Sequence, residues 1–100
     1  MAVIETMTFR LVEGADVDAF LRADKRLQSD FAYQQPGLIR RTTARGGGSN
    51  DGEWIVIDLW QSVEDADRAA ARWDDEESPR EFMSLVYPDS VQVRRYTDLD

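Results

Sequence analysis

The 100-residue sequence contains neither histidine nor cysteine. Without cysteine, the chain has no disulfide bond and no thiolate nucleophile, which fits a reducing compartment. Without histidine, it has no imidazole base, no Ser-His pair and no ordinary zinc site. A metal site built from carboxylates alone stays open, but no DxDxDG-like calcium loop is present. These absences exclude most of the common catalytic and metal-binding classes.

Positive charge and long apolar runs are also scarce. Lysine and arginine together number 12, against 20 aspartate and glutamate residues, and the formal net charge is −8. An acidic chain repels phosphate backbones, so we expect no nucleic-acid partner. No apolar run approaches the length of a membrane span, and the N-terminus lacks a signal-peptide pattern. We therefore expect a cytoplasmic protein without a membrane partner, folded as a single domain over residues 1–100.

Glycine is concentrated in residues 45–52, which read RGGGSNDG. This segment lacks the lysine of a phosphate-binding P-loop, and a strand-like run rather than a helix follows it. A glycine-rich link between two strand-like runs is typical of a hairpin, so we interpret the segment as a flexible hairpin tip.

The best-specified stretch of the chain is residues 52–73. Its β-branched and aromatic run WIVIDLW, residues 54–60, predicts a buried strand. Ser62 can cap the first free N–H groups of a following helix, and the acidic residues after it suit the positive end of the helix dipole. Alanines then continue the helix to about residue 73. One strand therefore passes directly into one helix.

The remaining elements follow from periodicity. An apolar stripe from Val17 to Phe31 predicts a helix that Asp16 caps, and Ser78 is expected to cap a short helix after the one that begins at residue 63. Strands are predicted over residues 3–12, 38–44, 53–61 and 91–96. The order strand, helix, strand, strand, helix, strand predicts an α+β, ferredoxin-like βαββαβ fold. Its four-stranded antiparallel sheet would carry helices on one face only.

The strand over residues 53–61 has two unlike faces. Ile55, Ile57 and Leu59 form a purely apolar face, which we expect the helices to cover. The other face carries Trp54 and Trp60 together with Val56 and Asp58, and tryptophans are costly to leave in water. Because so few helices cannot cover both faces of the sheet, the sequence predicts a homodimer.

Asp24 interrupts the apolar stripe of the first helix. We favour an interpretation in which it lies at the edge of the stripe and bonds to Gln28 or Arg22, because helix faces are rarely purely apolar. The alternative is a carboxylate directed into a cavity.

The sequence also resembles the antibiotic-biosynthesis-monooxygenase-like, dimeric α/β-barrel superfamily over nearly its whole length. The resemblance rests on the helix at residues 20–28 followed by QPGL, residues 35–38, and above all on LWQS, residues 59–62, which runs into an acidic helix start. In this superfamily the sheets of two chains close into a barrel. The resemblance therefore implies a homodimeric barrel, in agreement with the argument from the two-faced strand.

Haem-degrading members use an asparagine on the first strand, a tryptophan at the strand-to-helix junction and a histidine on the second helix. Trp60 matches the tryptophan, whereas the asparagine position falls near Met7 and the histidine position near Ala70 or Ala71. Since the chain has no histidine, the resemblance argues against haem degradation by that route.

Polyketide-oxidising members bind a flat aromatic substrate between the sheet and the helices, and the deprotonated substrate donates an electron directly to oxygen. The resemblance thus implies a cofactor-independent monooxygenase, with no metal or flavin, acting on a small aromatic or polyketide-like molecule. Such a site needs an apolar slot, a donor that stabilises an anion and a modest base. The catalytic candidates are Trp60, Asp24 and Arg40. The candidate ligand-binding residues are Phe20, Phe31, Asp58, Trp73 and Phe82, of which Asp58 is a second candidate base if burial raises its pKa.

Ordinary packing explains the same residues equally well. Aromatic side chains at helical spacing usually pack against a sheet, and Asp58 could pair with Arg40 or Arg41 across the hairpin. Three hypotheses therefore stay open: an enzyme, a non-catalytic dimer that binds a small hydrophobic or aromatic ligand, and a structural dimer whose interior is filled. An open cavity beside Trp60 would separate the first two from the third.

Overall fold

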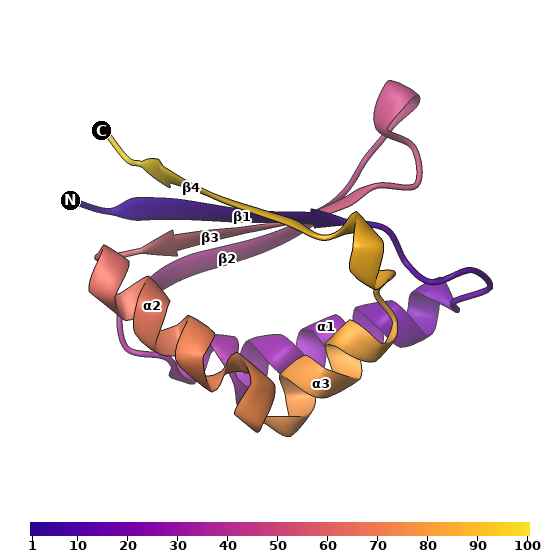
Figure 1. Cartoon of the computed structure of the whole chain (residues 1–100), viewed down its shortest axis with the longest axis horizontal. Coiled ribbons are helices and arrows are strands. Elements are labelled where there is room, and N and C mark those ends of the chain that lie inside the picture. The colour runs from indigo at the N-terminus through magenta and orange to yellow at the C-terminus, as the bar shows by residue number, and fades with distance from the viewer.

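The computed structural model describes all 100 residues of the chain (Figure 1). In chain order its main elements are β1 (Val3–Phe9), α1 (Val17–Asp30), β2 (Leu38–Arg45), β3 (Trp54–Trp60), α2 (Val63–Arg72), α3 (Glu77–Ser84) and β4 (Gln92–Thr97). This order confirms the predicted α+β, ferredoxin-like fold, with the second helical region divided into α2 and α3. No helix of the chain is both long enough and apolar enough to cross a membrane.

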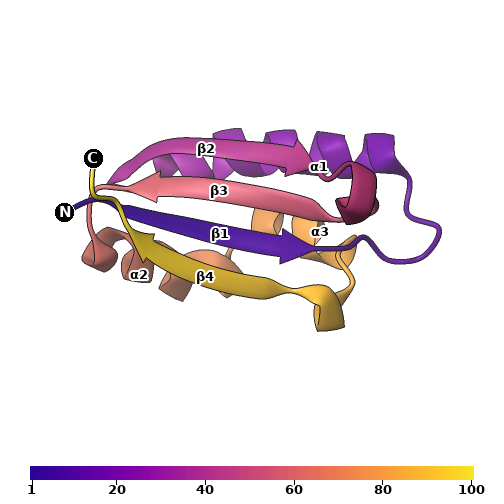
Figure 2. The same cartoon turned by 90° about the horizontal axis from the view of Figure 1, so that it is seen from above.

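The four strands form one antiparallel sheet in the order β2-β3-β1-β4. Figure 2 looks onto the sheet from above and shows the helices lying behind it, on a single face. The sheet therefore has one covered face, which packs on the helices, and one open face.

The caps of the first two helices agree with the sequence. The side chain of Asp16 accepts a hydrogen bond from the backbone N–H of Asp18, and Ser62 Oγ accepts one from the backbone N–H of Asp65. The predicted start of α3 is wrong, because this helix begins at Glu77 rather than after Ser78. A 3₁₀ turn over Trp73–Asp75 continues from the end of α2, so a single extended residue remains before α3 and Ser78 falls in its first turn.

The helices cover the face of β3 opposite to the one that the sequence led us to expect. Trp54 and Trp60 lie on the covered face and are only 5% and 4% exposed, whereas Ile57 lies on the open face and is 37% exposed. The covered face accommodates Asp58 because Arg41 lies opposite it on β2 and pairs with it. A mixed face can thus be buried once its charged residue has a partner, and the bulky indole rings then fill the space between sheet and helices.

The open face of the sheet is left with large apolar side chains. Ile39, Ile57 and Tyr96 are 49%, 37% and 50% exposed, respectively. The argument for a homodimer therefore survives with the faces exchanged: Ile57 and its neighbours, rather than the tryptophans, need a cover. The dimer itself remains a prediction.

A β-bulge near the start of β2 changes which arginine points inward. The pairing with β3 shifts between Leu38 and Arg40, so that Leu38 lies opposite Trp60 but Arg41 lies opposite Asp58. Because alternate residues of a strand point to opposite faces, the extra residue Ile39 moves Arg41 to the covered face and Arg40 to the open one.

Candidate functional site

A cavity of about 270 Å³ lies between the covered face of the sheet and the helices. All four strands contribute to its roof, and α2 contributes two alanines whose methyl side chains are too small to fill it. Its thirteen lining residues are Glu5, Met7, Phe31, Ala32, Arg41, Val56, Asp58, Trp60, Ala69, Ala70, Trp73, Val93 and Arg95. An apolar chamber with a few convergent polar groups is the usual form of a small-molecule site. The interior is open, as the enzyme and binder hypotheses require.

Asp58 is the most perturbed acid of the chain. Burial raises its pKa from 3.8 to about 7, while the nearby Arg41 guanidinium lowers the pKa and the carboxylates of Glu5 and Asp24 raise it. Burial dominates because an ionised carboxylate loses its hydration in this apolar chamber. Near neutral pH, Asp58 is therefore present in both its protonated and its ionised form.

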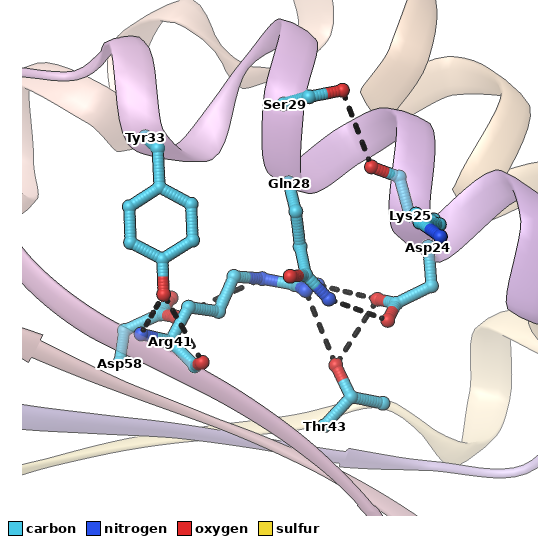
Figure 3. A network of polar contacts seen from close by, with 8 residues as sticks. All are labelled: Asp24, Lys25, Gln28, Ser29, Tyr33, Arg41, Thr43 and Asp58. Carbon is cyan, nitrogen blue, oxygen red and sulfur yellow. Dashed lines mark hydrogen bonds and ion pairs between the residues drawn. The ribbon is translucent and has the colours of Figure 1, made fainter.

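Arg41 lies at the centre of a buried polar network, drawn in Figure 3. Its Nη2 atom is 2.8 Å from Asp24 Oδ1, and its Nη1 atom donates a 3.1 Å hydrogen bond to Thr43 Oγ1. Asp24 also accepts hydrogen bonds of 3.1 Å from Thr43 Oγ1 and from Gln28 Nε2. The predicted bond between Asp24 and Gln28 is thus present, although Asp24 is buried rather than at the edge of the stripe.

The backbone of Arg41 is also held in place. Tyr33 Oη accepts a 2.9 Å hydrogen bond from Arg41 N and donates one of 3.3 Å to Arg41 O. The Arg41 side chain is only 3% exposed, and its ion pair with the 7% exposed Asp24 is shielded from solvent screening. The structure therefore offers a positive charge of fixed position at one end of the cavity.

Two buried polar atoms on the cavity wall lack a hydrogen-bond partner. They are Asp58 Oδ1 and Trp60 Nε1, which come from the same strand two residues apart and so share one face. Arg41 Nε approaches Asp58 Oδ1 only to 3.8 Å, which is too long for a hydrogen bond. Buried polar groups are nearly always satisfied, so an acceptor and a donor left free in one chamber indicate that a ligand completes them.

The structure brings only some of the predicted site residues to this cavity. Four of them line it: Phe31, Asp58, Trp60 and Trp73. Phe20 and Phe82 are fully buried in the aromatic core beyond the cavity, with ring centroids 5.2 Å apart. Asp24 does not line the cavity but contacts it through Arg41.

Arg40 is exposed and does not line the cavity, and Arg41 occupies the position expected of it. The bulge at Ile39 explains the difference, and nothing in the local sequence marks that bulge. Glu5 and Arg95 are further lining residues that sequence reasoning missed. Glu5 was detectable in principle, because it is an acid on the otherwise apolar face of β1.

The three positions used by haem-degrading members also converge here. Met7, Trp60 and Ala70 all line the cavity. The alignment inferred from the sequence is therefore spatially consistent. Ala70 has no side-chain group that could bind iron, and Met7 cannot hydrogen-bond as an asparagine does, so two of the three groups of the haem-degrading pattern are absent.

Comparison with solved structures identifies the fold. SnoaB, a cofactor-independent oxygenase from Streptomyces nogalater, superimposes with a TM-score of 0.78 at 18% identity, covering 99% of this chain and 94% of that one. A candidate antibiotic biosynthesis monooxygenase from Nitrosomonas europaea gives 0.73 at 10% identity, with 98% and 99% covered. A conserved protein from Methanosarcina mazei Go1 gives 0.72 at 12% identity, with 96% and 91% covered. No family model and no curated protein sequence matches the chain.

The chain therefore has the fold of the antibiotic-biosynthesis-monooxygenase-like proteins. The resemblance inferred from the sequence is confirmed at the level of the fold. Identities between 10% and 18% to these three structures carry no substrate from one protein to the other.

Proposed function

We propose that this protein is a cofactor-independent monooxygenase that acts on a small aromatic or polyketide-like molecule bound in the cavity. The observation that carries the proposal is the convergence of three groups on one apolar chamber: the protonatable Asp58, the buried cation of Arg41 and the unpartnered N–H of Trp60. They match the three needs of such a reaction, which are a base, an anion stabiliser and an oriented hydrogen-bond donor.

Asp58 takes the part of the base. With a pKa of about 7, a large share of Asp58 is ionised at neutral pH, and its carboxylate is basic enough to remove an activated proton. A suitable proton is that of a methylene group between an aromatic ring and a conjugated carbonyl, because the resulting carbanion is delocalised onto oxygen. Asp58 replaces Asp24 in this role, since Asp24 is engaged with Arg41, Thr43 and Gln28.

Arg41 and Trp60 stabilise the charge that develops on the substrate oxygen. Trp60 Nε1 has no acceptor in the protein and is free to donate to that oxygen. The Arg41 guanidinium supplies a fixed positive field in a chamber from which an aromatic substrate expels water, and such preorganised groups are strongest in a dry site.

The chemistry balances without another reductant. Deprotonation of the methylene carbon gives a carbanion, which transfers an electron to O₂ and then forms a C–O bond. Loss of water from the resulting hydroperoxide leaves a carbonyl group. One methylene and one O₂ are thus converted into one carbonyl and one water, and the substrate supplies all four electrons.

Oxygen consumption with a panel of anthrones and hydroquinones tests this proposal. We expect uptake with at least one anthrone in metal-free buffer, and a loss of at least about 100-fold in kcat for Asp58→Asn, as is usual when a general base is removed. The matched control is Asp74→Asn, which removes an exposed carboxylate outside the cavity. If a panel member binds but none consumes oxygen, the protein is a non-catalytic ligand-binding module instead.

We further propose that the protein works as a homodimer assembled through the open face of the sheet. The exposed Ile39, Ile57 and Tyr96 support this, because large exposed apolar side chains on an uncovered sheet face favour an interface. A cytoplasmic location remains a prediction from the cysteine-free composition.

A further inference from the structure

A row of four charged side chains crosses the entire covered face of the sheet. Arg41 of β2 lies opposite Asp58 of β3, Asp58 lies opposite Glu5 of β1, and Glu5 lies opposite Arg95 of β4. All four residues line the cavity, and no other titratable side chain does. The row is continuous only in the folded sheet, because its members are far apart in the sequence.

The helices supply one further carboxylate at each end of the row. Asp24 of α1 pairs with Arg41, and Asp67 of α2 pairs with Arg95. The complete order is therefore Asp24, Arg41, Asp58, Glu5, Arg95, Asp67. Charges alternate in sign everywhere except at the centre, where two carboxyl groups are neighbours.

Directly opposed residues on one face of an antiparallel pair have Cβ atoms about 5 Å apart, and like charges at that position repel. The two central carboxyl groups are not equivalent. Glu5 Oε2 accepts a 2.7 Å hydrogen bond from Arg95 Nε, whereas Asp58 has only Arg41 Nε at 3.8 Å. Arg41 is also shared with Asp24 and Thr43. Arg95 thus balances the charge of Glu5, whereas Asp58 has no partner at hydrogen-bond distance and its protonated form is favoured.

The row also differs in solvent access at its two ends. The side chains of Arg41 and Asp24 are 3% and 7% exposed, whereas those of Arg95 and Asp67 are 33% and 61% exposed. The central pair therefore lies between a buried end at Asp24 and a more exposed end at Asp67, and the side chains of Asp58 and Glu5 are each 19% exposed.

We propose that Glu5 is a positioning residue for Asp58: the two side chains form a carboxyl pair in which Asp58 holds the proton and Glu5 pairs with Arg95. In the substrate-free protein, burial raises the pKa of Asp58 most, and the neighbouring charge of Glu5 raises it further. The catalytic meaning of the pair rests on the proposed function, but the pair itself is a property of the free protein.

Side-chain ¹³C NMR of the substrate-free protein across a pH titration tests the pair directly. The Asp58 carboxyl resonance is assigned by its loss in Asp58→Asn. We expect a midpoint near 7 in the wild type and a fall of about one pH unit in Glu5→Gln, because a neighbouring negative charge has been removed. Glu5→Asp, which keeps the charge, and Glu13→Gln, which removes an exposed carboxylate outside the cavity, should leave the midpoint close to that of the wild type.

A second reporter guards against misfolding of the assignment variant. Trp60 lies two residues from Asp58 on the same face, so its indole Nε1–H resonance follows the ionisation of Asp58 in the wild type and in Glu5→Gln alike. A downward shift of both reporters in Glu5→Gln supports the pair. An unchanged or raised midpoint in Glu5→Gln, or an equal shift in Glu13→Gln, overturns it.

The failure of this inference is distinguishable from failure of the proposed function. The titration requires no substrate, so it decides on the pair even if no anthrone consumes oxygen. Where turnover is found, the acid limb of the kcat/KM profile should move down in Glu5→Gln by the same amount as the NMR midpoint. If the NMR midpoint of Asp58 moves in Glu5→Gln while the acid limb of the kcat/KM profile stays in place, Glu5 does not act on the reaction through Asp58.

Discussion

Replacement of Asp58 by asparagine should stabilise the fold at neutral and alkaline pH. The pKa of Asp58 is raised from 3.8 to about 7 in the folded protein. Between these values the folded chain holds a proton that the unfolded chain has released. The contribution of Asp58 to stability is therefore full below about pH 4 and is lost as the pH rises through about 7. This is the opposite of the usual behaviour of a salt-bridged aspartate.

The magnitude follows from the size of the shift. The raised pKa corresponds to about 3 units, and each unit is worth about 1.4 kcal/mol, so full ionisation of Asp58 costs the fold about 4 kcal/mol. Entry of water into the cavity and rotation of the side chain reduce this cost, so it is an upper value. Between about pH 5 and about pH 8, we expect the stability difference between Asp58→Asn and the wild type to grow by about 2–3 kcal/mol.

Urea unfolding of both proteins at the two pH values measures this difference. Asparagine is close in size to aspartate and does not titrate, so the other ionisable groups largely cancel in the comparison. Asp74→Asn, an exposed control, should show no such pH dependence. A difference between Asp58→Asn and the wild type that is the same at both pH values would refute the argument, since it would mean that Asp58 titrates alike in the folded and unfolded chains.

Three further outcomes are expected. Asp24→Asn should destabilise the fold by about 3–5 kcal/mol in urea unfolding, because it leaves the buried guanidinium of Arg41 without its 2.8 Å partner. Trp60→Phe should lower kcat/KM about tenfold on any oxygen-consuming substrate, the value of one hydrogen bond, and an unaltered kcat/KM would exclude a role for the indole N–H. Ile57→Lys should convert a dimer into a monomer in sedimentation experiments, whereas Val63→Lys, at a similarly exposed apolar residue on α2, should not. A wild type that sediments as a monomer at micromolar concentration would contradict the dimer.

Local chemistry made much of the fold predictable. The run from Trp54 to Trp60 is rich in β-branched residues and has a tryptophan at each end, and Ser62 caps the next helix with acidic residues in its first turn. Strand and helix could therefore be placed without the structure. In the same way, the N-cap Asp16 and the apolar stripe from Val17 to Phe31 allowed α1 to be placed from the sequence. These signals involve residues that are close together in the sequence, which is why they can be recognised without the tertiary structure.

The candidate site was predictable only in part. Trp60 and Asp58 could be selected through the family resemblance, but the alternation of inward and outward residues along β2 changes at a bulge that nothing in the local sequence marks. Arg41 rather than Arg40 therefore enters the cavity. The covered face of the sheet was also misjudged, since the burial of Asp58 depends on a partner from another strand.

What the sequence determined by itself is the order of the elements, the period of each and the absence of histidine and cysteine chemistry. Tertiary structure alone decided which face of the sheet the helices cover, and which charges meet. The row from Asp24 to Asp67 exists because four strands come into one register and two helices pack beneath them. Such contacts depend on distances across the fold, and a raised pKa such as that of Asp58 is a consequence of those distances rather than of its neighbours in the chain.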